Sequence, residues 1–207
     1  MLDQIYNDWW QNVIVFYNGK NPKRGAFIEK VITYSIPVDP ATKFNHMQVL
    51  SKCLQAAHIV PNDIEKKGIE NIINVFDSFY KSIIETAENN NSIAYSWTTL
   101  DVIIQCRNLF AQLFASKHIN ADIFSEIALE LLSETKCDNY SDVTLYCLAF
   151  HLVHLTNDAD YFVEFLKKPN LNTRWDRIVY RDIEYMKLKS KVPQNVYNRI
   201  KRKQEYN

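Results

Sequence analysis

The sequence predicts an all-α fold, a single domain of about nine to ten helices arranged as an irregular bundle or a HEAT-like stack. Apolar residues recur at intervals of three and four over most of the 207 residues, which is the spacing of one face of an α-helix. The breaks in this pattern fall at residues that begin or end helices. No segment repeats with a fixed period, so the sequence does not define a regular repeat protein.

Four helices are predicted before residue 88. The first has the apolar stripe Leu2, Ile5, Trp9, Val13 and Phe16. It ends at Gly19, because glycine readily adopts the left-handed conformation that terminates helices. The next two begin with an N-cap residue followed by proline, at Asn21 with Pro22 and at Asp39 with Pro40. After the first of these caps, the segment 27–36 has helical apolar spacing and is closed by Pro37. Residues 61–63 introduce a long amphipathic fourth helix.

Six more helices are predicted after a polar break at residues 88–92, which contains three successive asparagines. The break is where the domain, residues 1–207, could divide in two, although five residues are too few for a domain linker. The predicted helices cover residues 97–117, 121–134, 141–155, 158–167, 173–189 and 193–203. Short helices joined by short loops are typical of bundles and helical stacks.

Composition predicts a protein of a reducing compartment. It also predicts that the chain does not span a membrane. The cysteines Cys53, Cys106, Cys137 and Cys147 form no C-x-x-C pair and follow no amino-terminal export segment, which predicts free thiols in a cytoplasmic protein. The longest apolar run, residues 143–155, is well short of the roughly 20 residues that a membrane span needs. Lys plus Arg equals Asp plus Glu at 24 each, so no global field attracts nucleic acid or anionic lipid.

Several classes of enzyme lack their sequence signals. The three glycines, Gly19, Gly25 and Gly68, match no P-loop, dinucleotide fingerprint or kinase loop, so nucleotide binding through a glycine loop is not expected. No G-x-S-x-G elbow is present either. Arg107, flanked by apolar residues, is expected to be a partly buried structural cation that pairs with Asp101 or another carboxylate. These features favour a non-enzymatic protein.

Acidic residues at steps of four form the sharpest feature of the sequence: Asp122, Glu126, Glu130, Glu134, Asp138 and Asp142. Each step of four turns about 40° around a helix, so the first four acids form one slowly winding ridge. Ile123, Phe124 and Ile127 are among the apolar residues of the other side, and they direct the ridge toward solvent.

The charge is divided between two neighbouring segments. Residues 120–165 contain nine acids and one base, a net charge of −8, and residues 166–207 contain twelve bases and four acids, a net charge of +8. Such runs are often merely solvated helix faces. The functional interpretation is that Asp122, Glu126, Glu130, Glu134 and Asp138 dock a basic protein partner. Its narrowest form is an immunity or antitoxin-type inhibitor of a nuclease toxin, because a row of carboxylates can imitate nucleic-acid phosphates.

Two alternatives use other residues. The basic residues of the carboxyl-terminal segment, interleaved with tyrosines, could contact nucleic-acid phosphates: Lys187, Lys189, Lys191, Arg199, Lys201, Arg202 and Lys203. His151, His154 and Asp158 lie at i, i+3 and i+7 and could form part of the metal site of a hydrolase. No H-E-x-x-H motif accompanies them, so core or helix-end histidines are the favoured interpretation and no cofactor is expected.

Overall fold

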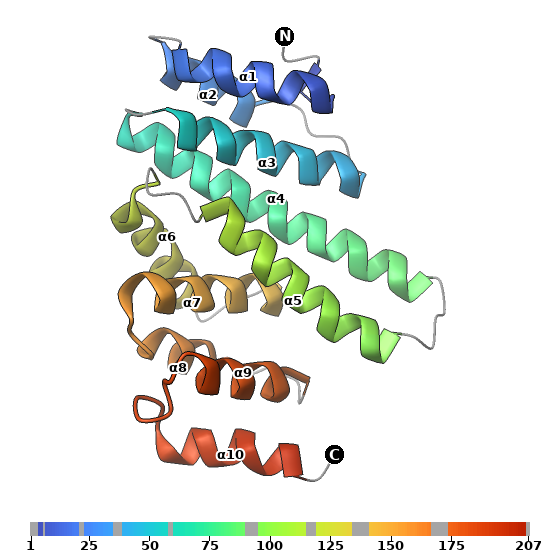
Figure 1. The fold of residues 1–207 in the computed structure, drawn as a ribbon, viewed down its shortest axis with the longest axis vertical. Helices are drawn as coiled ribbons and strands as arrows, with labels where there is room; N and C mark the ends of the chain where they lie inside the picture. Colours follow the sequence, from blue (N-terminus) through green and yellow to red (C-terminus); the bar gives the residue numbers. More distant parts are fainter. Residues whose placement is uncertain are drawn as a thin grey trace.

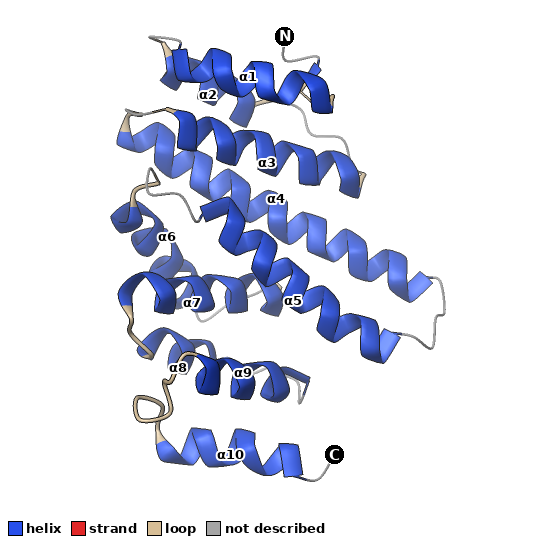
Figure 2. Cartoon of the chain, in the orientation of Figure 1, coloured by secondary structure: helices blue, strands red, loops and turns tan. Residues whose placement is uncertain are grey.

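In a computed structural model, the chain forms a stack of α-helices that extends from one terminus to the other (Figures 1 and 2). The structure describes residues 4–5, 7–20, 23–34, 39–57, 60–89, 95–114, 119–133, 141–166 and 174–205. These residues contain ten helices and no strand, which confirms the predicted all-α fold. None of these helices is long and apolar enough to cross a membrane.

The helices are α1 (Asp8–Lys20), α2 (Arg24–Ile32), α3 (Pro40–Ala56), α4 (Asn62–Asn89), α5 (Tyr95–Phe114), α6 (Ala121–Ser133), α7 (Asp142–Thr156), α8 (Asp160–Leu166), α9 (Arg174–Tyr185) and α10 (Gln194–Glu205). Helices α1 and α2 lie at one end of the stack and α9 and α10 at the other (Figure 1). The predicted break, residues 88–92, overlaps the end of α4 at residues 88 and 89, and residues 90–94 lie outside the described part. Helix α4 nevertheless packs against α5, α6 and α7, which all follow the break.

Two N-caps show how the sequence starts these helices. Asp39 accepts a hydrogen bond from the Thr42 N–H at 2.9 Å, and Pro40 occupies the first turn of α3 as predicted. At α7, the Ser141 hydroxyl accepts from the Thr144 N–H. Helix α7 is buried from Val143 to Val153 because it is apolar on nearly every side, and it packs against α4, α5, α6 and α8.

Two predicted helix ends are wrong. Gly19 lies inside α1, which ends at Lys20, and none of the glycines in the described residues has a positive φ. A Cβ on Gly19 would lie 3.4 Å from the carbonyl oxygen of Ala56, so this glycine lies close to the end of α3. The helix predicted for residues 27–36 ends at Ile32; Asn21, Pro22 and residues 35–38 lie outside the described part.

Helix α9 also ends earlier than residue 189. Lys187 adopts a left-handed conformation, with φ 56°, just after the helix. Its N–H donates to the carbonyl of Glu184, and the Leu188 N–H donates to the carbonyl of Ile183. These two bonds form a Schellman motif. Because lysine takes the position that glycine usually holds in this motif, the sequence contained no signal for the end of α9.

Candidate docking surface

Helix α6 directs the predicted carboxylates toward solvent. Asp122, Glu126 and Glu130 are exposed, whereas the opposite side of the helix is buried through Ile123, Phe124, Ile127, Ala128 and Leu132. We call Asp122, Glu126 and Glu130 the acidic ridge. Glu134 and Asp138, which were predicted to extend it, lie outside the described part of the structure.

The start of α6 is fixed by polar side chains. The side-chain oxygen of Asn120 accepts a hydrogen bond from the Asp122 N–H at 3.0 Å and so caps the helix. The backbone N–H of Asn120 in turn donates to the carboxylate of Glu65, on α4, at 2.7 Å. Glu65 is buried, so α6 is attached to α4 and the orientation of the acidic ridge is set by the core.

A lysine of α4 lies beside the acidic ridge. The Lys66 ammonium is 2.8 Å from the Glu126 carboxylate, and both side chains are largely exposed, at 36% and 66%. The bond with Glu126 raises the pKa of Lys66, and the charges of Glu130 and Glu70 act in the same direction. One base therefore faces three acids from two helices, and the surface stays acidic.

Leu129 interrupts the carboxylates with an exposed apolar side chain. It follows Asp122 by seven residues and Glu126 by three, so it lies on the same face of α6. Its exposed fraction is 43%, although most apolar residues of α6 are buried. Sequence reasoning missed this residue, but the seven-residue spacing was a signal. Lys66 and Glu70 carried no such signal, because they belong to another helix.

Some of the basic residues at the other end of the stack make contacts within the molecule. Lys187, Lys189, Lys191 and Lys201 are exposed, and the side chains of Arg199, Arg202 and Lys203 lie outside the described part. The Lys189 ammonium lies 5.1 Å from the centre of the Tyr197 ring. The Lys191 ammonium donates to the carbonyl of Asn157 at 2.6 Å, at the end of α7. Tyr185 is 75% exposed.

The two histidines of the metal alternative have different surroundings. His151 is buried, and its ring centre lies 5.0 Å from that of Phe124 and about 6 Å from those of Phe110 and Phe114. Burial lowers the pKa of His151 to about 4. His154 is exposed and Asp158 follows the end of the helix. Within the described residues, no group of three His, Cys, Asp or Glu side chains is arranged to hold a metal ion.

Arg107 is the partly buried cation that the sequence predicted, but its partner is distant in the sequence. Its guanidinium lies 2.6 Å from the carboxylate of Asp182 on α9, and it stacks over the Phe150 ring at 4.5 Å. The Tyr146 hydroxyl donates to the same carboxylate. Asp182 is only 2% exposed, so this group connects α5, α7 and α9 through a buried charge pair.

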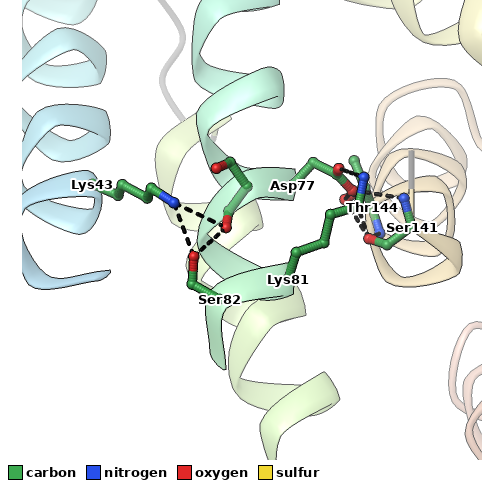
Figure 3. Close-up of polar contacts among 7 residues, drawn as sticks. Lys43, Asp77, Lys81, Ser82, Ser141 and Thr144 are labelled. Carbon is green, nitrogen blue, oxygen red and sulfur yellow. Dashed lines mark hydrogen bonds and ion pairs between the residues drawn. The ribbon is translucent and has the colours of Figure 1, made fainter. Parts of the chain in front are cut away.

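A second buried carboxylate, Asp77 of α4, holds the start of α7 (Figure 3). One of its oxygens accepts bonds of 2.7 Å from the Ser141 N–H, the Ser141 hydroxyl and the Thr144 hydroxyl. The other oxygen lies 2.6 Å from the Lys81 ammonium. Burial raises the pKa of Asp77, but the bonds from Lys81, Ser141 and Thr144 outweigh it, and the net pKa lies below the usual range.

Most of the described charged residues that the sequence singled out thus lie on the surface or in contacts between helices. The cysteines Cys53, Cys106 and Cys147 are buried free thiols, and burial raises the pKa of each; Cys137 lies outside the described part. The three acids of the acidic ridge are exposed on one side of α6, opposite its buried side. No protein-family model matches the chain, and no curated protein or solved structure is significantly similar to it.

Proposed function

We propose that this protein is a non-enzymatic binding module whose acidic ridge docks a basic protein. The observation that carries the proposal is the outer face of α6, where the exposed Leu129 lies among Asp122, Glu126 and Glu130. An exposed apolar side chain among mainly acidic side chains resembles the apolar centre and charged rim of a protein interface. The carboxylates steer a cationic surface toward the ridge, and Leu129 provides an apolar contact once water is excluded.

The rigid support of α6 favours this role. Glu65 and Asn120 fix its first turn on α4, and five of its side chains are in the core, so the acidic ridge keeps its shape without a partner. A preorganised surface loses little conformational entropy when it binds. The narrowest form of the proposal is an immunity or antitoxin-type inhibitor, in which the ridge covers the phosphate-binding surface of a nuclease toxin. Its support is the likeness between a row of carboxylates and a row of phosphates.

The test uses the purified chain as bait in a lysate of its own host, with washes of rising salt concentration. The ridge variant carries Asp122→Lys and Glu130→Lys, which leaves the bond between Lys66 and Glu126 intact. A matched control carries Glu29→Lys and Glu85→Lys, two exposed glutamates of α2 and α4, and has the same net charge; it removes only the exposed 3.8 Å ion pair between Glu29 and Lys67.

The expected result is a basic protein that the wild type and the control retain at low salt and release at high salt, and that the ridge variant does not retain. Equal retention by the ridge variant and the control would mean that the ridge is only a solvated helix face. Nucleic acid recovered in place of protein would favour the second candidate, in which the exposed Tyr185 and its neighbouring lysines stack on and neutralise a single strand.

A further inference from the structure

The carboxyl-terminal end of the stack also has an exposed large side chain beside charged residues, and these charges are opposite to those of the acidic ridge. We call α9, α10 and their connection the basic hairpin. Tyr185 is the most exposed large aromatic side chain of the described residues, at 75%. Arg181 lies one turn before it on the same side of α9, and Lys187 follows two residues later. Two bases therefore flank an exposed aromatic side chain, and the one exposed acid beside it, Glu184, accepts a hydrogen bond from the Tyr197 hydroxyl.

The two segments that contain these surfaces have opposite net charges of equal size. The segment that contains the acidic ridge, residues 120–165, has a net charge of −8, and the segment that contains the basic hairpin, residues 166–207, has a net charge of +8. Leu129 and Tyr185 provide one exposed apolar side chain each. Opposite potentials with apolar centres are what two complementary interface patches require.

The described residues do not pair these charges within one molecule. The ion pairs there join Lys66 to Glu126, Lys67 to Glu29, Lys81 to Asp77 and Arg107 to Asp182, and none connects the acidic ridge with the basic hairpin. Helix α6 packs on α4, α7 and α8, whereas α10 packs on α9. Among the described residues, Asp122 and Glu130 of the acidic ridge and Arg181 and Lys187 of the basic hairpin take part in none of these ion pairs, and these four charges can contact another molecule.

The position of the two surfaces allows a closed assembly. Helix α6 and the connection between α9 and α10 both lie on the left side of the stack in Figure 1. A two-fold axis beside this side would bring α6 of each copy next to the connection between α9 and α10 of the other, so that the same contact forms twice. We propose that the chain forms such a two-fold homodimer. This inference rests on the proposed function and names the basic hairpin of a second copy as the partner of the acidic ridge.

The first measurement is sedimentation velocity of the full chain, from micromolar to near-millimolar concentrations and at two salt concentrations. Raising the salt from about 0.1 M to about 1 M shortens the Debye length from about 10 Å to about 3 Å. A dimer held by exposed charges is expected at the lower salt, with a dissociation constant that rises at least about tenfold at the higher salt. A chain that remains monomeric at low salt overturns the inference.

Charge reversal then identifies the surfaces. The ridge variant, Asp122→Lys with Glu130→Lys, and a hairpin variant, Arg181→Glu with Lys187→Glu, are each expected to dimerise at least about tenfold more weakly than wild type. The hairpin variant leaves the contacts of Lys189 and Lys191 in place. Matched controls with the same net charges carry Glu29→Lys with Glu85→Lys, and Lys30→Glu with Lys52→Glu, all at exposed positions.

Mixing the two reversed variants gives the decisive result. In a mixed dimer each contact again joins a positive surface to a negative one, so the mixture is expected to dimerise although neither variant does so alone. Misfolding cannot produce this rescue. A mixture that stays monomeric, or controls that weaken dimerisation equally, would contradict the homodimer.

Two other outcomes separate this inference from the proposed function. A monomer that binds a basic host protein through the acidic ridge overturns the homodimer and leaves the proposed function standing. A monomer that binds a single-stranded oligonucleotide, with loss of binding in the hairpin variant, overturns the homodimer in favour of nucleic acid as the partner of the basic hairpin.

Discussion

Acid is expected to destabilise this fold through one buried histidine, His151. The ring lies in the aromatic cluster of Phe110, Phe114 and Phe124, and its Nε2 atom has no hydrogen-bond partner within the described structure. Desolvation is the main reason that its pKa falls to about 4, and the charge of the neighbouring His154 adds to the effect. The folded state therefore holds His151 neutral, and protonation has to place a charge among apolar rings.

The magnitude follows from the difference between the two states. An unfolded histidine has a pKa of about 6.5, so between about pH 6.5 and about pH 4 the unfolded chain binds more protons than the folded one. The free energy of unfolding consequently falls as the pH drops through this window. With a folded pKa of about 4, the loss from His151 is about 2 kcal/mol at pH 5 and reaches about 3 kcal/mol below pH 4.

The assay compares urea unfolding of the wild type and His151→Leu, a replacement of similar volume, between about pH 7.5 and about pH 5. The wild type should lose about 2 kcal/mol more than the variant over this range. His46, whose pKa burial also lowers, is present in both chains, so its contribution cancels in the comparison. Parallel pH profiles for the two proteins would refute the reasoning, because they would mean that His151 is hydrated or paired when charged.

Substitutions at three further positions test other contacts by urea unfolding. Asp77→Ala should cost about 3 to 5 kcal/mol because it leaves buried donors unpaired, whereas Asp77→Asn should cost about half as much; a loss no larger than that of the exposed Asp63→Ala would contradict this. Asp182→Ala should also cost about 3 to 5 kcal/mol, since Arg107 loses its buried partner, and a loss under about 1 kcal/mol would show that water replaces the carboxylate. Gly19→Ala should stabilise by about 0.5 kcal/mol because Gly19 is helical, and a loss of stability would mean that the added Cβ does not fit beside Ala56.

The helices could be predicted from the sequence because their signals are local. Apolar spacing and the Asp39 cap act within a few residues, and the exposed face of α6 follows from its buried side. The end of α9 could not be predicted in the same way, since Lys187 adopts there a conformation that glycine usually provides. Local signals also could not identify the partner of Arg107, because Asp182 is 75 residues away from it in the sequence.

The acidic ridge was the part of the candidate site that the sequence could define, because its members are four residues apart on one helix. Its surroundings depend on how helices far apart in the chain are packed. Lys66 reaches Glu126 across 60 positions of sequence, and no pattern within α4 indicates which helix it will face. The same limit applies to the acidic segment 120–165 and the basic segment 166–207. Their net charges can be counted from the sequence, but their contacts depend on how the helices are packed.

The buried polar side chains follow a common rule that explains why a fold of short helices contains them. Every helix end leaves backbone groups without partners, and a stack of short helices places many such ends away from water. Polar side chains of neighbouring helices bond to several of these ends: Asp77 to the Ser141 N–H, Glu65 to the Asn120 N–H and Ser51 to the Leu113 carbonyl. An apolar replacement at such a position leaves the backbone group of another helix unpaired, and the resulting loss includes the desolvation of that group. The buried acids thus hold helices together, and the acids that face solvent are the ones that can contact a partner.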